Sequence, residues 1–160
     1  MHDDFEWSEP DHKADEILFR NVRKHGCHIV GITDADPAFA FSIGLYLNCR
    51  HPELIIFGLP SDDAQAVINH VRDHVSDGRK FADGDISDDL FADCKICFWQ
   101  VPFGSYREYL GIARWLYGKS GLAFPCFQVI WQDANQRSPW EQGCEPYVIK
   151  AQPLLKKTVS

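Results

Sequence analysis

Apolar residues recur along this chain with two different periods, which predict helices in some segments and strands in others. Spacing of three and four residues predicts a helix within residues 8–25, a second helix from Ser61 and a third over residues 105–117. Gly26 and Gly118 follow the first and third of these segments, where a helix stop is expected. Three amphipathic helices are therefore expected, each with one apolar face to bury.

Alternating or unbroken apolar runs predict five strands. Residues 53–59 are apolar on both faces, which indicates a central strand. The connections between the first three strands are too short for a helical crossover, so these neighbours should pair antiparallel. The expected fold is α+β: an antiparallel sheet or a partly closed, split-barrel-like barrel with flanking helices. The predicted strands cover residues 27–33, 39–45, 53–59, 90–101 and 124–133.

Neither a repeat nor a low-complexity linker divides the chain, so a single domain is expected. Within it we distinguish an N-terminal helical extension at residues 1–25, a core at residues 26–143 and a C-terminal tail at residues 144–160. The segment PWEQGCEPYVIKAQPLL, residues 139–155, contains Pro and Trp, and we expect it to wrap around the domain.

Composition narrows the class of partner. The 160 residues are 45% hydrophobic and 24% charged, as in ordinary globular proteins, and the net charge is -7. An acidic chain disfavours nucleic acid and anionic membrane surfaces as partners. The apolar runs are far shorter than the roughly 20 residues that span a bilayer. The first residues, MHDDFEWSEPDH, are acidic and polar, unlike a signal peptide, so a cytoplasmic location is expected.

The six cysteines are expected to be reduced thiols, because their spacing matches no small disulfide scaffold. Cys94 and Cys97 form a C-x-x-C motif, but they lie in a predicted strand. A redox pair would instead be expected at a helix N-terminus. A second C-x-x-C that could complete a zinc site is missing from the sequence.

Several short motifs occur in an order that resembles a bacterial domain-of-unknown-function family, the one numbered 4262. They are a strand that begins with His, P-x-F-x-Y-T-x-G-L, H-P-E-L, hydrophobic-x-G-L, Q-L-V-W and P-W-E, and the resemblance covers residues 26–143. Phe41 and Ser42 depart from the Tyr and Thr of the pattern. The family has no settled activity, so the resemblance implies none. The matching residues are His28, Pro37, Phe39, Gly44, Leu45, His51, Pro52, Glu53, Leu54, Gly58, Leu59, Gln128, Trp131, Pro139, Trp140 and Glu141.

His51 and Glu53 stand at the start of the central predicted strand and have two interpretations. Two positions apart in extended chain, they would point to one side and could act together on a ligand or a metal ion. Alternatively, His51-Pro52 closes a turn, since X-Pro favours extended and turn geometry, and Glu53 caps or ion-pairs at the strand start.

Metal sites have weak support in the sequence. His70 and His74 are four residues apart on the second predicted helix, but the glutamate of H-E-x-x-H is missing. The segment DGDISDD resembles the beginning of a calcium loop, yet Asp88 occupies its required glycine position and Cys94 its last glutamate position. These patterns predict no metal ion.

Three functions remain open. The first is a small-ligand-binding or protein-interaction module whose pocket includes His28, Ser42, His51, Glu53, Trp131 and Trp140. The second is a flavin-dependent redox protein of split-barrel type, a dimer in known cases, although basic residues for the flavin phosphate are scarce in the strands. The third is a hydrolase, with or without a metal ion, that uses His51 with Glu53 or Cys49. The binding module remains by elimination.

Overall fold

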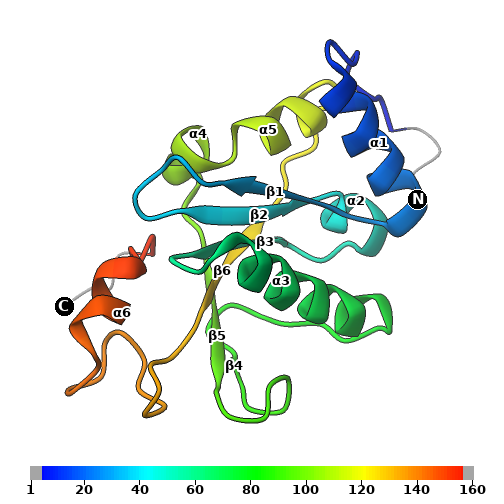
Figure 1. Cartoon of the computed structure of the whole chain (residues 1–160). Helices are drawn as coiled ribbons and strands as arrows, with labels where there is room; N and C mark the ends of the chain where they lie inside the picture. Colours follow the sequence, from blue (N-terminus) through cyan, green and yellow to red (C-terminus); the bar gives the residue numbers. More distant parts are fainter. Residues whose placement is uncertain (1–4, 157–160) are drawn as a thin grey trace.

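A computed structural model gives the structure of residues 5–156, a sheet flanked by helices (Figure 1). The helices lie on both faces of the sheet and at one of its edges. In spatial order the six strands are β1 (His28–Ile32), β2 (Phe39–Ile43), β3 (Glu53–Phe57), β6 (Cys126–Ile130), β5 (Ile96–Gln100) and β4 (Ile86–Ser87). The helices are α1 (Lys13–His25), α2 (Leu45–Cys49), α3 (Ser61–Ser76), the 3-10 helix η1 (Phe103–Ser105), α4 (Tyr106–Tyr109), α5 (Gly111–Gly118) and α6 (Pro146–Ala151).

The predicted α+β class and single domain are confirmed. As expected from the short connections, β1–β2 and β2–β3 are antiparallel. The sheet stays open between its outer strands β1 and β4, so the partly closed barrel that the sequence allowed does not form. One central pair, β3–β6, is parallel, because the long connection through α3, β5 and α5 returns the chain in the same direction.

Apolar side chains form one core on each face of the sheet. Phe41 and Ile43 of β2 pack with α1, α4 and α5 on one face. Ala40 of β2 and Leu54 and Ile56 of β3 pack against α3 on the other face. Figure 1 shows α4 and α5 on the opposite side of the sheet from α3. Central strands need apolar residues on both faces for this reason, and β3 is buried throughout.

The first helix begins later than the predicted segment, which opens at residue 8. It starts at Lys13, and the Asp15 carboxylate accepts a hydrogen bond from the His12 backbone N–H. Ser8, the first residue of the predicted segment, instead donates its hydroxyl to the Trp115 carbonyl at 2.7 Å. The predicted end is confirmed, since Gly26 adopts the left-handed conformation with φ 82°.

Other elements differ from prediction where tertiary contacts override local pattern. The helix expected over residues 105–117 breaks at Leu110 (φ -115°, ψ 34°) into α4 and α5. The strand expected over residues 90–101 forms only within Ile96–Gln100. Helices α2 and α6 are too short to show helical periodicity in sequence. None of the helices in residues 5–156 is long and apolar enough to cross a membrane.

Candidate functional site

Glu53 is fully buried at the start of β3, where β2 and β3 separate. Backbone pairing of the two strands ends at Phe41 and Ile55, and the Glu53 carboxylate occupies the gap beyond that pair. The three N–H groups that bond it belong to the first turn of α2 and to the residue before it, so the carboxylate caps this helix. It accepts five hydrogen bonds in all, from the Ser42 and Tyr117 hydroxyl groups and from the backbone N–H groups of Gly44, Leu45 and Tyr46.

Two opposing effects act on the ionisation of Glu53. Burial raises its pKa, and the hydrogen bonds from Tyr117, from Ser42 and from backbone N–H groups oppose that rise. Because a backbone N–H can only donate, the surrounding groups complement a carboxylate and not an amide. The geometry is that of a structural cap that attaches α2 to the sheet.

His51 lies in the core on the other face of the sheet. Its Nε2 accepts the Phe81 backbone N–H at 3.2 Å, so Nδ1 carries the proton and donates to the Pro52 carbonyl at 2.9 Å. The ring packs edge-on against Phe81 and Phe127. Burial lowers the pKa of His51. The expected convergence of His51 and Glu53 is therefore absent: the imidazole faces the α3 layer and the carboxylate faces Tyr117 on the α5 layer.

The two predicted tryptophans lie near the C-terminal tail. Trp131 donates its indole N–H to the Phe57 carbonyl at 2.8 Å, and its backbone exchanges two hydrogen bonds with the Gln152 side chain. Trp140 stacks on Trp99 with ring centroids 4.5 Å apart and is 43% exposed. Among the six predicted site residues, a hydrogen bond joins only Ser42 to Glu53.

His28 is different, because it lines a solvent-accessible hollow of about 390 Å³ that we call the polar pocket. The pocket lies between the C-terminal half of α1, the start of β1 and the middle of α3. Its wall contains three carboxamides, two imidazoles and one guanidinium, and no carboxylate. The lining residues are Asn21, His25, Cys27, His28, Ile29, Gln65, Asn69 and Arg72.

The deepest polar groups of this pocket are half-buried and oriented. The Asn21 amide donates to Nδ1 of His28 at 2.8 Å, which leaves the proton of the neutral ring on Nε2. Burial lowers the pKa of His28. The Arg72 side chain is 23% exposed and contacts the more exposed Asp73 carboxylate at 3.1 Å. The donors left for a ligand include the Nε2–H of His28, the Asn69 carboxamide and the Arg72 guanidinium, which suit an anion.

The surroundings of the Cys27 thiol, which lines the polar pocket, make it unreactive. Cys27 is buried, and burial followed by the Glu53 charge raises its pKa far above the ordinary range, although the Arg72 guanidinium opposes this. A thiol held in its neutral form is a poor nucleophile. All six cysteines are free thiols in the structure. The polar pocket therefore offers binding groups without a nucleophile.

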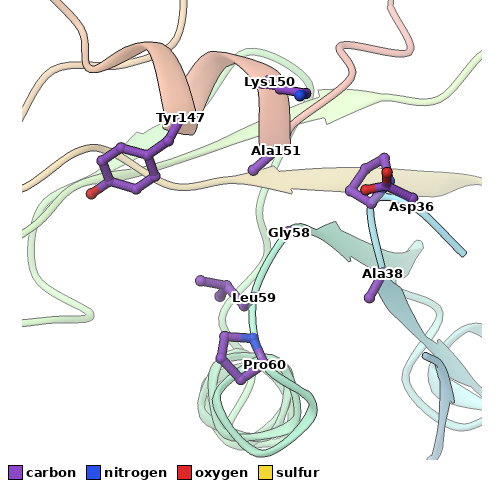
Figure 2. Close-up of a pocket in the computed structure, with 9 residues that line it drawn as sticks. Asp36, Ala38, Gly58, Leu59, Pro60, Tyr147, Lys150 and Ala151 are labelled. Carbon is purple, nitrogen blue, oxygen red and sulfur yellow. The ribbon is translucent and has the colours of Figure 1, made fainter. Parts of the chain in front are cut away.

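A second hollow, of about 460 Å³, lies at the C-terminal end of β3 (Figure 2). Figure 2 shows it between α6 and the turn Gly58–Pro60, with Tyr147 on one side and Asp36 on the other. Gly58 has φ 82°, and a Cβ at this position would lie 2.6 Å from Ala151 Cβ. The glycine is thus required for α6 to pack on this turn. The walls are mainly apolar and carry one acid, Asp36, and one base, Lys150.

The residues that were candidates for a metal site or a hydrolase site form other contacts in the structure. His70 Nε2 lies 2.6 Å from the Leu90 carbonyl, and its ring packs against His74 and Phe91. Within residues 5–156 there is no group of three or more His, Cys, Asp or Glu side chains that could hold a metal ion. Neither ring nitrogen of His51 bonds Cys49, so this pair lacks the hydrogen bond of an activated nucleophile.

Sequence reasoning missed most of the polar pocket, although a signal for it was present. Gln65, Asn69 and Arg72 follow one another at spacings of four and three, and Asn21 and His25 are four apart. Each set occupies one face of its helix, α3 or α1. Long polar side chains beside an apolar stripe are ordinary on the exposed side of a helix. These residues can be recognised as a pocket only once α1 and α3 are seen to pack beside the start of β1.

Comparison with known proteins gives one family. The family model described as Domain of unknown function (DUF4262) matches residues 21–145. No curated protein and no solved structure matches the chain.

Proposed function

Because this chain belongs to the DUF4262 family, we propose that residues 21–145 carry its function and that this function is to bind a small anionic molecule in the polar pocket. Every residue that lines the polar pocket falls inside the matched region. The wall of the pocket in Figure 2 instead includes Tyr147, Lys150 and Ala151, which lie beyond residue 145. A function of the family domain is better served by the pocket that this domain builds alone.

The observation that carries the proposal is the charge of the lining. The chain has a net charge of -7, yet its polar pocket combines His25, His28 and Arg72 with carboxamides and includes no carboxylate. A guanidinium with neighbouring N–H donors is the usual protein partner of carboxylate and phosphate oxygens. Asp73 contacts Arg72 from the solvent side, and an incoming anion would compete with it.

The occupant is a small polar anion, a carboxylate or a phosphate ester, since about 390 Å³ is at the small end of ligand pockets. The Nε2–H of neutral His28 and the Arg72 guanidinium are the two groups expected to hold its oxygens. Six free thiols support a cytoplasmic location as part of the proposal. Nucleic acid is disfavoured by the net charge.

The test is an NMR titration of the ¹⁵N-labelled protein with sulfate and with inorganic phosphate as probes. We expect saturable shifts of the side-chain N–H signals of Asn69 and Arg72. Arg72→Gln and His28→Gln should each weaken binding by about tenfold, the effect of losing one charge-assisted hydrogen bond. The exposed Arg20→Gln on α1 is the matched control and should bind as the wild type does. Equal affinity in all three variants would overturn the proposal.

Native mass spectrometry of the purified protein separates this function from its alternatives. A small anionic mass that disappears on denaturation supports the polar pocket. A flavin-sized mass supports the redox alternative, and a bare chain that captures another protein supports an interaction module. The native charge envelope also shows whether the protein is a monomer or a homodimer.

A further inference from the structure

A second ligand site is indicated on the α4–α5 side of the molecule, away from the polar pocket. Two adjoining hollows, of about 290 and 500 Å³, share the residues Phe103, Tyr106 and Arg114. Together they form one groove, which we call the aromatic groove. It runs from the loop after α5, at Leu122–Phe124, past the shared residues to Arg107 of α4.

The floor of the groove is apolar even though two of its rings are phenols. Tyr106 donates its hydroxyl to the Phe124 carbonyl at 2.9 Å, and Tyr117 donates its hydroxyl to Glu53. Both hydroxyl groups are thus used inside the protein, and these rings present carbon to the groove. Tyr117 is fully buried and Tyr106 is 6% exposed, so both rings lie beneath the surface of the groove. Phe103 packs on Tyr106 with ring centroids 5.1 Å apart and is 64% exposed. Its ring is therefore accessible to a ligand in the groove.

Two cations stand at the rim of this floor. Within residues 5–156, neither the Arg107 nor the Arg114 guanidinium has an ion pair or a hydrogen bond. The lining of the groove contains no carboxylate. Glu9, which is not part of the lining, pairs with Lys119 at 3.9 Å. In a chain of net charge -7, an aromatic floor beside two unpaired arginines is complementary to an anion with an apolar body.

We propose that the aromatic groove binds an amphipathic organic anion: an aromatic or branched apolar group that carries one carboxylate, sulfonate or phosphate. The apolar group lies on Phe103 and Tyr106, and the anionic group bonds Arg107 and Arg114. This site takes a different ligand class from the polar pocket, whose walls are mainly polar. The proposal for this site is therefore independent of the proposed function.

The probe is 8-anilinonaphthalene-1-sulfonate, which joins an aromatic body to one sulfonate and fluoresces when it leaves water. Titration of the folded full-length protein should give a saturable rise in fluorescence. Indole-3-acetate should displace the probe, whereas acetate and sulfate should not. Competition by sulfate at the concentration that fills the polar pocket would place the probe there and overturn the proposal.

Two variants and two controls decide which residues hold the probe. Arg107→Gln with Arg114→Gln should weaken binding by about tenfold or more, and Phe103→Ala by a similar factor. Arg20→Gln and Tyr147→Ala remove an exposed arginine and an exposed aromatic ring elsewhere and should change nothing. Near-ultraviolet circular dichroism checks that each variant is folded. Unchanged binding in the Arg107/Arg114 double variant or in Phe103→Ala would overturn the proposal.

Discussion

The Tyr117 hydroxyl donates a 2.5 Å hydrogen bond to the Glu53 carboxylate, although the two residues are 64 positions apart in the chain. The same hydroxyl accepts the Leu47 backbone N–H at 3.2 Å. Helix α5, strand β3 and helix α2 are therefore joined through one oxygen atom. Glu53 is the buried acid at which these elements meet, so its contribution to stability should be large.

Glu53→Gln should destabilise the protein by about 3 kcal/mol or more, because an amide N–H₂ would face N–H donors that the carboxylate now satisfies. Tyr117→Phe should cost less, about 1–3 kcal/mol, since it removes one donor and leaves one N–H without its acceptor. Urea unfolding measures both. Glu6→Gln, at an exposed position, is the control. A Glu53→Gln variant as stable as this control would contradict the capping role.

Stability should fall as the pH drops below about 6.5, the ordinary histidine pKa. Burial lowers the pKa of His51 in the fold, so the unfolded chain takes up a proton first and folding is disfavoured as the pH falls. Burial of His28 acts in the same direction.

The test compares thermal midpoints between pH 8 and pH 5 for the wild type and for His51→Leu. We expect a lower midpoint at pH 8 in the variant, from lost hydrogen bonds, and a shallower decline on acidification. His12→Gln, at an exposed position, should keep the wild-type slope. An unchanged slope in His51→Leu would show that this imidazole does not carry the effect.

Gly58→Ala should be strongly destabilising. The residue has φ 82°, and its added Cβ would lie 2.6 Å from both Cβ and the carbonyl oxygen of Ala151 in α6. Gly78→Ala is a matched control, because Gly78 also has positive φ (103°) but open space around its Cβ position. We expect about 1 kcal/mol for the control, from backbone strain, and at least about twice that for Gly58→Ala. Equal losses would mean that the contact with α6 contributes nothing.

If the polar pocket binds anions, sulfate affinity should rise as the pH falls from 8 to 5.5. Burial holds the pKa of free His28 low, and a bound dianion favours its protonated form, so binding takes up a proton. The other lining groups that can carry charge or titrate are His25, Arg72 and Cys27. Isothermal titration calorimetry at several pH values measures the slope. His28→Gln should remove most of it, and a slope that persists would assign the proton to another group.

Local pattern alone was sufficient for the helices and strands that bury one continuous face. The apolar spacing that starts at Ser61 predicted α3, the unbroken run after Glu53 predicted the central strand β3, and Gly26 predicted the end of α1. Short connections predicted both antiparallel pairs at one edge of the sheet. These features depend on side-chain period and chain reach, which a sequence contains directly.

Only the tertiary structure determined what the polar residues do. Glu53 and Tyr117 meet because α5 packs over β3, and His51 turns away from Glu53 because it fills the opposite core. The polar pocket exists because flanks of α1 and α3 close on the start of β1. Burial, hydrogen-bond partners and the charge of a cavity arise between segments far apart in sequence. The sequence by itself therefore determined the family, the α+β class and the buried faces, and the fold determined which polar groups are satisfied and which remain for a ligand.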